Sequence, residues 1–498
     1  MNTEAGSRTF QAYSWFQLAD RAARFPNELA TELLQERHPS ALLTLEHLLA
    51  DHLITERIVL DQLIYNWAEI DSPYKQTPLP PAYKAPHVSL QWEGLRDGDQ
   101  HGLSGVKRLS SQFDLIKPVF AKFPSYGITM ADLGMPISGP IEQQKIISMI
   151  KFIHEHHIPI VPAVAGRTHP DDVTAIKEVG HYVNSHFGEK ITVYAFVGSS
   201  RIRMLAQGQD KWNLANISKW IENTVVELKT DPSIQEVIIP FEDTFGAFPD
   251  DIDHLFRTAF NVGADRICIC DTCSRAYSPE WTRHLLRFIG HTIAPDYPNK
   301  LWEIHTHNML GDAVTNAITA TQEGLVSVVH GTFGGVGDLG GNMPIESFLL
   351  HALHQKIPLN SSFDLTGLGQ TLTHILSSRG ISSTLNPFSG TIHSEAARMI
   401  PTGTHADAFK RLGEVGPHMR KIIEHVYFPI SPTKLGLDIR LDVVTPVSGK
   451  ANVRALAERL GIADKLTTDH ITAILSKARN TGEPLSDEQF LEAFSSVL

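Results

Sequence analysis

Residues 301–308 read LWEIHTHN, and this stretch decides how the rest of the chain is interpreted. It begins with the apolar residues Leu301 and Trp302 and carries His305 and His307 with one residue between them. Alternate side chains of a β-strand lie on the same face, so a strand here directs both imidazoles to one side. Two imidazoles on one face form half of a divalent metal site. The chain has 25 histidines, so the pair is also consistent with two histidines on an ordinary polar face.

The residues that follow the histidine pair favour the metal site. A run with helical spacing covers residues 311–323, an apolar run covers residues 325–330, and a glycine-rich loop, GTFGGVGDLGGN, covers residues 331–342. A strand that ends in polar ligands and leads into a helix is typical of the C-terminal face of an α/β barrel, where such enzymes have their active sites.

The same alternation extends over about 270 residues. From residue 87 onward, short apolar runs alternate with amphipathic runs of helical period. Eight strand–helix units of this length predict a (β/α)₈ barrel. A doubly wound open sheet is the alternative, but no G-x-G-x-x-G follows the first strand. The eight predicted strands are HVSLQWE from His87, GITMADLG from Gly127, IPIVPAVA from Ile158, ITVYAFVG from Ile191, QEVIIPFE from Gln235, DRICICDT from Asp265, LWEIHTH from Leu301 and LVSVVHGT from Leu325.

Segments of different character flank the predicted barrel. Residues 1–72 have leucine and isoleucine at helical spacing, and residues 72–86 are rich in proline and predict an extended linker. We therefore expect a helical N-terminal extension with linker over residues 1–86 and the barrel over residues 87–360. Residues 361–498 are expected to form mixed, mainly helical C-terminal subdomains.

Charge and composition exclude several classes of function. The net charge is −12 and there is no long basic run, which argues against nucleic-acid binding and against adhesion to anionic membranes. No run of about 18 apolar residues predicts a transmembrane helix. The N-terminal residues lack the basic start and apolar core of a secretory signal.

The three cysteines, Cys268, Cys270 and Cys273, lie close together in one predicted strand and its end. An odd, clustered set indicates a reducing compartment, so we expect a cytoplasmic protein. The C-x-C-x-x-C spacing is also compatible with a zinc site, but the apolar surroundings favour buried structural thiols.

Polar residues at the strand ends supply further candidate ligands. The first strand ends in EGLRDGDQ, which places Arg96 and Asp97 at the barrel rim, and the loop after the eighth strand supplies Asn342. One carboxylate, the two imidazoles and an amide oxygen leave open positions on a divalent ion, as a Lewis acid that binds substrate requires. Taken alone, Asp97 is equally compatible with a turn and Arg96 with a surface ion pair. The other polar strand ends either contact substrate or cap the next helix; they are Asp132, Arg167, Ser199 with Ser200, Glu242 with Asp243, and Asp271 with Thr272.

Six motifs together resemble the 2-isopropylmalate synthase and homocitrate synthase family of metal-dependent, Claisen-condensing barrel enzymes. In the barrel, LRDGDQ, HTHN and GGVGDLGGN are similar to the family patterns LRDGxQ, HxHND and GxGERxGN. In the C-terminal part, TGTHADAF, HVYFPISP and VSGKANV resemble SGSHQDAI, VPYLPIDP and QSGKGGV, the last two of which are typical of the longer 2-isopropylmalate synthases. The resemblance covers residues 87–453 and identifies the superfamily more firmly than the substrate.

The resemblance implies a role for each matching residue. Asp97, His305 and His307 would hold a divalent metal (Mg²⁺, Mn²⁺ or Zn²⁺), with Asn342 completing or approaching its shell. Arg96 would lie against the ketone oxygen of a 2-oxo acid, and Thr272 would contact its carboxylate. The substrate contacts expected of Arg167, Ser199 and Asp132 come from their strand-end positions.

The C-terminal motifs imply a homodimer. His405 and Tyr427 would enter the partner subunit's active site and, near Glu242, assist removal of a proton from the methyl group of acetyl-CoA. Without the resemblance, the sequence favours a surface position for His405 and a core position for Tyr427; the resemblance reverses this preference. A histidine that titrates near neutral pH suits the role of base.

The sequence also departs from the family patterns. Met309 stands where the family has Asp, Asp338 and Leu339 where it has Glu and Arg, and Asp132 where Glu is usual. We expect a different substrate or reduced activity, because residues around ligands orient them. The chain ends at Leu498, so we expect no regulatory domain and no feedback inhibition by leucine.

Three functions remain open from the sequence. The first is condensation of acetyl-CoA with a 2-oxo acid, as in 2-isopropylmalate synthase or, with 2-oxoglutarate, homocitrate synthase. Glu303, on the same face as His305, hints at such a polar substrate. The second is carbon–carbon cleavage, as in HMG-CoA lyase. The third is a weakly active homologue that acts as a binding protein.

Overall fold

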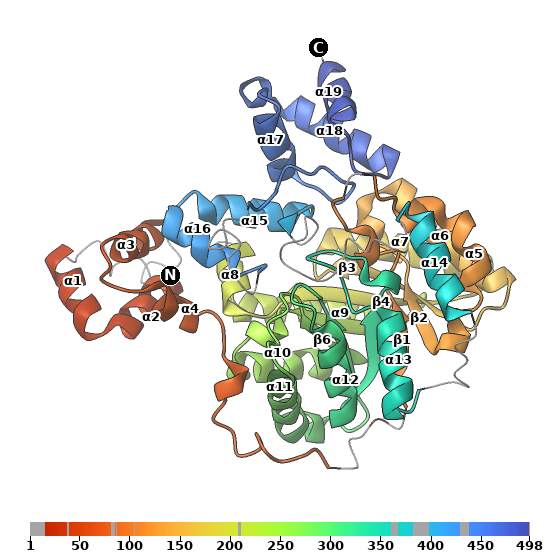
Figure 1. The fold of residues 1–498 in the computed structure, drawn as a ribbon, viewed down its shortest axis with the longest axis horizontal. Helices are drawn as coiled ribbons and strands as arrows, with labels where there is room; N and C mark the ends of the chain where they lie inside the picture. Colours follow the sequence, from red (N-terminus) through yellow and green to blue (C-terminus); the bar gives the residue numbers. More distant parts are fainter. Residues whose placement is uncertain are drawn as a thin grey trace.

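The computed structural model describes residues 15–36, 39–80, 85, 87–103, 105–207, 211–359, 367–381, 398–428 and 438–497. Eight parallel strands pair in sequence order and β8 closes on β1, so the barrel is complete (Figure 1). The prediction of a (β/α)₈ barrel is confirmed, and each predicted strand overlaps an observed one. The strands are β1 (Ser89–Trp92), β2 (Ile128–Asp132), β3 (Val161–Arg167), β4 (Ile191–Gly198), β5 (Ile234–Glu242), β6 (Arg266–Asp271), β7 (Leu301–Thr306) and β8 (Val326–Gly331).

Helices cover the outside of the barrel because each strand sends alternate side chains outward. The side chains of Leu90, Ile128, Val193 and Ile304 belong to the large core between strands and helices, whereas Tyr194 belongs to a smaller core inside the barrel. Helix α8 is an additional short helix between β4 and α9. The helices are α5 (Phe113–Phe120), α6 (Pro140–Glu155), α7 (Pro170–Phe187), α8 (Arg201–Gln207), α9 (Leu214–Lys229), α10 (Pro249–Asn261), α11 (Pro279–Thr292), α12 (Ala313–Glu323), α13 (Ile345–Gln355) and α14 (Leu368–Ser378).

Helical segments precede and follow the barrel, as predicted (Figure 1). The N-terminal helices lie beside α15 and α16, and α17–α19 form a separate small core. The expected domain boundaries at residues 86 and 360 both fall on residues outside the described part of the chain, so the division remains a prediction. The helices are α1 (Trp15–Arg24), α2 (Pro26–Glu36), α3 (Pro39–Ala50), α4 (Glu56–Asp61), α15 (Gly403–Gly413), α16 (Pro417–Glu424), α17 (Lys450–Arg459), α18 (Thr468–Thr481) and α19 (Asp487–Ser495).

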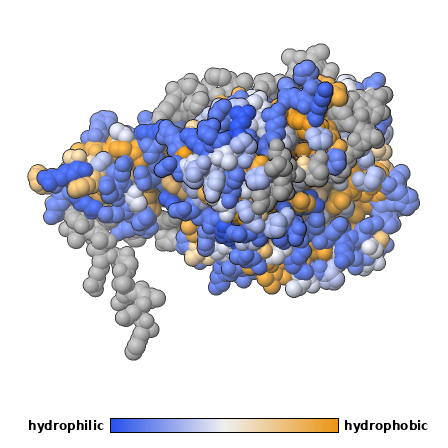
Figure 2. All heavy atoms as spheres, turned by 90° about the horizontal axis from the view of Figure 1, so that it is seen from below, coloured by the Kyte–Doolittle hydropathy of each residue, from blue (hydrophilic) through white to orange (hydrophobic). Residues whose placement is uncertain are grey.

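The surface is mixed in polarity. Figure 2 shows a mainly hydrophilic face with scattered apolar side chains, some of them on the N-terminal helices at the left. Large exposed apolar residues of these helices are Trp15, Phe16, Phe25 and Leu43. Across the described ranges, no helix combines the length and the hydropathy needed to cross a membrane.

Candidate active site

Three side chains converge at the C-terminal ends of β1 and β7. His305 Nε2 lies 3.1 Å from His307 Nε2 and 3.3 Å from Asp97 Oδ2, and His307 Nε2 lies 3.8 Å from the same carboxylate oxygen. The predicted same-face arrangement of the two imidazoles is thus observed. Ligand atoms that are about 2.0–2.2 Å from one ion lie roughly 3–3.5 Å apart, so these atoms are spaced as the ligands of one divalent cation.

The far side of each imidazole is held by another group. His305 Nδ1 lies 2.8 Å from Glu93 Oε2, and His307 Nδ1 lies 3.0 Å from the backbone oxygen of Asp338. Partners of this kind orient metal-binding histidines. Burial lowers the pKa of His307 to about 4, against the opposing charge of Asp97, so its imidazole is neutral at pH 7. Both Nε2 atoms are therefore directed toward the carboxylate of Asp97, and the three residues fit a divalent metal.

Arg96 connects this cluster to its surroundings. Its Nη1 donates to Asp97 Oδ2 at 3.0 Å, its Nη2 to Glu93 Oε1 at 2.8 Å and its Nε to Asp132 Oδ2 at 3.0 Å. Burial raises the pKa of Asp97, but the adjacent guanidinium and the two imidazoles outweigh it and keep that pKa well below its usual range. Asp97 is therefore a carboxylate, as a metal ligand must be.

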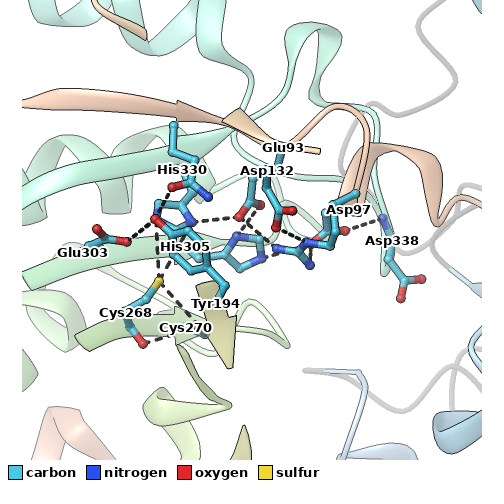
Figure 3. Close-up of polar contacts among 12 residues, drawn as sticks. Glu93, Asp97, Asp132, Tyr194, Cys268, Cys270, Glu303, His305, His330 and Asp338 are labelled. Atoms are coloured by element: carbon cyan, nitrogen blue, oxygen red, sulfur yellow. Dashed lines mark hydrogen bonds and ion pairs between the residues drawn. The ribbon is translucent and has the colours of Figure 1, made fainter. Parts of the chain in front are cut away.

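A second polar layer lies deeper in the barrel, beneath the candidate ligands (Figure 3). His330 of β8 bridges two carboxylates, with Nδ1 2.8 Å from Glu93 Oε1 and Nε2 2.9 Å from Glu303 Oε2. Tyr194 and Arg266 also donate to Glu303, at 3.0 and 3.1 Å. Burial lowers the pKa of His330, but Glu93 and Glu303 raise it to about 9, so the bridge is charged at neutral pH. Within this layer, both nitrogens of His330 and both oxygens of Glu303 have polar partners.

The deeper layer corrects the interpretation of Glu303. Its carboxylate is engaged by three partners and does not line the cavity, so it supplies no polarity to a bound substrate. The sequence favoured buried structural thiols in this region, and Cys268, Cys270 and Cys273 are indeed buried and free. Cys268 does lie 3.9 Å from His330 Nε2, so it is close to this layer, but His330 already has a carboxylate partner on each nitrogen.

The cluster opens into a cavity of about 1050 Å³. His405 of α15 and Glu242 at the end of β5 also line this cavity, with His405 Nε2 4.0 Å from Glu242 Oε1. The ring of Tyr427 packs behind His405, with centroids 4.8 Å apart. Arg203 of α8 is fully buried and donates to Glu242 Oε2 at 3.2 Å. One cavity therefore joins the metal-binding cluster to a carboxylate and an imidazole that could handle a proton.

His405 does not have the protonation behaviour expected from the sequence. Burial, together with the positive charge of Arg203, lowers its pKa to about 3. The neutral imidazole, which is the form that accepts a proton, therefore prevails throughout the neutral range. The expectation of titration near neutral pH is wrong, although a role as base is still compatible with the geometry.

This shift leads to a pH prediction. The unfolded histidine takes up a proton below about pH 6.5, whereas folded His405 does so only near pH 3, so stability falls as the pH drops between these values. We expect His405 to cost about 2 kcal/mol of unfolding free energy at pH 5 relative to pH 8. In the His405→Gln variant, the loss of stability between pH 8 and pH 5, measured by urea denaturation, should shrink by that amount. An unchanged loss would contradict the assignment.

The C-terminal residues do lie at a barrel mouth, as predicted: His405 lies beside Glu242, and the ring of Tyr427 lies beside that of His405. The exchange of this segment between the subunits of a homodimer stays a prediction, because residues 382–397, which connect it to the barrel, lie outside the described part of the chain. Thr402 also contacts the barrel, with Oγ1 3.4 Å from Asp338 Oδ2. Helix α15 packs on α8 and on α16.

The remaining predicted site residues divide into two groups. Thr272 and Arg167 line the cavity, although Arg167 is held by a bidentate contact with Asp172. Asp132, Ser199 and Asn342 do not line it. Asp132 is buried behind Arg96, and Ser199 donates to the backbone oxygen of Glu242 at 2.8 Å.

The backbone of Asn342 lies beside the backbone of His307. It forms an isolated antiparallel bridge with His307, while its side-chain oxygen points to Gly337, where a Cβ would stand only 1.6 Å away. The structure thus supports Asp97, His305 and His307 as a metal-binding set and shows no contact of the Asn342 side chain with them.

The departures from the family patterns leave these contacts in place. Asp338 contacts His307 and Asp97 through its backbone oxygen and N–H, at 3.0 and 3.1 Å, so a shorter side chain does not alter either contact. Met309 and Leu339 belong to the apolar core shared with α15 and α16. The altered residues thus pack against the C-terminal helices and leave the candidate ligands intact.

The sequence analysis did not identify three residues of the site. Glu93 lies in the EGLRDGDQ motif and His330 at an inward position of β8, so strand periodicity was the available signal for both. Arg203 gave no signal in the sequence; it reaches Glu242 because α8 begins just after β4, whose last residue pairs with Glu242 of β5.

Comparison with known proteins agrees with this geometry. The family model described as HMGL-like matches residues 89–375, which is more than half of the chain. A putative (R)-citramalate synthase of Methanothermobacter thermautotrophicus is 27% identical over 242 residues, covering 49% of this chain and 44% of the relative. The 2-isopropylmalate synthase of Heliobacterium modesticaldum is 25% identical over 266 residues, covering 53% and 47%. The homocitrate synthase of Saccharolobus solfataricus is 28% identical over 228 residues, covering 45% and 43%.

The matched region thus spans less than half the length of each of these curated relatives. Among solved structures, the HMG-CoA lyase of Brucella melitensis aligns with a TM-score of 0.46 and 15% sequence identity, covering 59% of this chain and 99% of the lyase.

Proposed function

We propose that this chain, which belongs to the HMGL-like family, catalyses the metal-dependent Claisen condensation of acetyl-CoA with a 2-oxo acid. The products would be a 2-alkylmalate-type acid and CoA. The observation that carries the proposal is the single cavity that joins the Asp97–His305–His307 cluster to Glu242 and His405. The three curated relatives described above are all named as synthases, which supports the same class of reaction.

The metal-binding half of the cavity would receive the 2-oxo acid. Asp97, His305 and His307 would hold a divalent ion, which when bound polarises a ketone as a Lewis acid. Arg96 lies beside them, and its three carboxylate contacts keep the guanidinium in one orientation. Thr272, on the same cavity wall, would contact the substrate carboxylate.

His405 and Glu242, which line the same cavity, would remove the proton from acetyl-CoA. The methyl group of acetyl-CoA is a weak carbon acid, so removal of its proton needs a positioned base. Neutral His405, 4.0 Å from Glu242, is placed for this task, with the buried charge of Arg203 beside both. The enolate carbon would then form a bond to the ketone carbon, while the C=O π bond opens to an alkoxide that takes up a proton. Water would cleave the thioester to a carboxylic acid and release CoA as a thiol.

A thiol-release assay tests the proposal. The purified protein, supplied with Mg²⁺, Mn²⁺ or Zn²⁺ and acetyl-CoA, should release free CoA only when a suitable 2-oxo acid is present. A panel of 2-oxo acids with small, branched and acidic side chains would identify the substrate. Release of CoA with no 2-oxo acid, or none with any member of the panel, would contradict the proposal; carbon–carbon cleavage of a hydroxyacyl-CoA would instead leave the thioester intact.

A further inference from the structure

The cysteines of the C-x-C-x-x-C motif have no role in the proposed reaction. Cys268 and Cys270 share the inner face of β6, because side chains two residues apart in a strand point the same way, and both line the cavity. Cys273 follows the strand and does not line it. The apolar run around the motif favoured structural thiols, but the folded barrel brings an imidazole and a carboxylate to Cys268 from two other strands.

Closure of the barrel places Cys268, Glu303 and His330 together. The pairing of β6 with β7 sets Cys268 opposite Glu303, and β8 brings His330 from the other side of β7. Cys268 Sγ lies 3.9 Å from His330 Nε2, which lies 2.9 Å from Glu303 Oε2. One ligand atom from each of these buried residues lies within 4.8 Å of the others. Atoms bound to one zinc ion at about 2.0–2.3 Å lie roughly 3–4 Å apart, so small side-chain rotations would bring the three to a common ion.

The imidazole and the carboxylate also have outer partners of the kind that metal ligands have. His330 Nδ1 lies 2.8 Å from Glu93 Oε1, which leaves Nε2 to face a metal. Tyr194 donates to Glu303 Oε2 at 3.0 Å, and Arg266 donates to Glu303 Oε1 at 3.1 Å. Partners of this kind fix the orientation of ligands. An ion would replace the contact between His330 Nε2 and Glu303 Oε2, two atoms that would both bind it.

An ion can reach this group from the cavity, because Cys268 and His330 both line it. Metal binding displaces protons from its ligands. Here the ion would replace the thiol proton of Cys268 and the Nε2 proton of the His330 imidazolium, and both protons would pass to water. A divalent ion thus takes the place of two protons, so the buried layer keeps its net charge.

We propose that Cys268, Glu303 and His330 form a second metal site, which takes Zn²⁺ and lies deeper in the barrel than the metal-binding cluster described above. A thiolate, an imidazole and a carboxylate suit zinc, whereas Mg²⁺ and Mn²⁺ prefer oxygen ligands. Water from the cavity would occupy the fourth position of a tetrahedral ion. The deep site rests on these contacts and does not depend on the proposed condensation.

Glu93 joins the deep site to the metal-binding cluster (Figure 3). One of its oxygens lies 2.8 Å from His330 Nδ1, and the other lies 2.8 Å from His305 Nδ1. The same carboxylate therefore orients one imidazole of each site. Because a thiolate site discriminates against Mn²⁺, loading with Mn²⁺ counts the metal-binding cluster alone, whereas Zn²⁺ or Co²⁺ counts both sites.

Metal content tests the deep site without reference to activity. Protein freed of metal by a chelator and dialysed against Zn²⁺ should bind two ions per chain. Cys268→Ser and Asp97→Ala should each bind one, because each variant loses a different site. The matched control is Cys273→Ser, since Cys273 is a buried free thiol of the same motif outside the group, and it should bind two. A single ion per wild-type chain, or two in Cys268→Ser, would overturn the proposal.

Cobalt shows whether sulfur is a ligand. Co²⁺ bound by a thiolate has a charge-transfer band in the near ultraviolet that nitrogen and oxygen ligands do not produce. Wild-type protein and Asp97→Ala, titrated with Co²⁺, should show this band, and Cys268→Ser should lack it. Absence of the band in wild-type protein would overturn the proposal even if Cys268→Ser failed to fold. Wild-type protein that binds both ions but condenses no 2-oxo acid would reject the proposed function and leave the deep site in place.

Discussion

Asp97→Ala and His307→Ala are each expected to lose most of the bound divalent metal and nearly all condensing activity. Either change removes one of three ligand atoms spaced 3.1–3.8 Å apart. Loss of a group that only orients a ligand costs about 10–100-fold, so loss of a ligand itself should exceed about 100-fold. Manganese content of Mn²⁺-loaded protein, by elemental analysis, and thiol release measure the two effects.

The matched control is Asp99→Asn, two residues from Asp97 in the same turn. The Asp99 carboxylate accepts hydrogen bonds from the backbone of Leu109 and Ser110 and from Arg379, so it holds the loop and takes no part in the ligand cluster. We expect this variant to be less stable but to bind metal in the wild-type amount. One Mn²⁺ ion per chain in folded Asp97→Ala would remove the cluster from consideration.

Arg96→Lys is expected to reduce kcat by about 100-fold or more while the metal remains bound. Lysine keeps the positive charge but not the planar fork of donors. A single ammonium cannot reproduce the three contacts that Arg96 makes with Glu93, Asp97 and Asp132. The lysine ammonium would therefore be poorly oriented toward the ketone of the 2-oxo acid, and at least one buried carboxylate would lose its hydrogen-bond partner.

Arg201→Lys is the control for this substitution. Arg201 also contacts a carboxylate through two guanidinium nitrogens, that of Asp251, but its side chain is 41% exposed and it does not line the cavity. We expect near-normal kcat for it. If Arg96→Lys instead lost its metal while its turnover per bound metal stayed normal, Arg96 would be a structural residue.

The barrel and all three residues of the metal-binding cluster could be predicted from the sequence. Apolar runs of strand length recur between runs of helical period, and this local pattern survives in the fold because side-chain direction depends on neighbouring residues alone. The same period of two predicts that His305 and His307 share a face. The ends of parallel strands meet at one rim, which also brought Asp97 and Arg96 into the prediction.

The partners of these residues depend on the closure of the barrel. Pairing of β1 with β8 places Glu93 2.8 Å from His330, which is 237 residues away in the sequence. Burial of His405 of α15, together with the charge of Arg203, lowers the pKa of its imidazole, and no sequence pattern records this burial. The role of Asn342 stays a prediction: its backbone pairs with that of His307, and its side-chain oxygen faces Gly337.

The alternation of eight strands with helices, the histidine pair and the helical nature of both flanking segments follow from the sequence. The tertiary structure was needed to show which carboxylates surround Arg96, that His330 bridges Glu93 and Glu303, and that Arg203 contacts Glu242. Periodicity and capping depend on residues a few positions apart. These contacts instead join segments that are far apart in the sequence, and they form only when whole surfaces pack together.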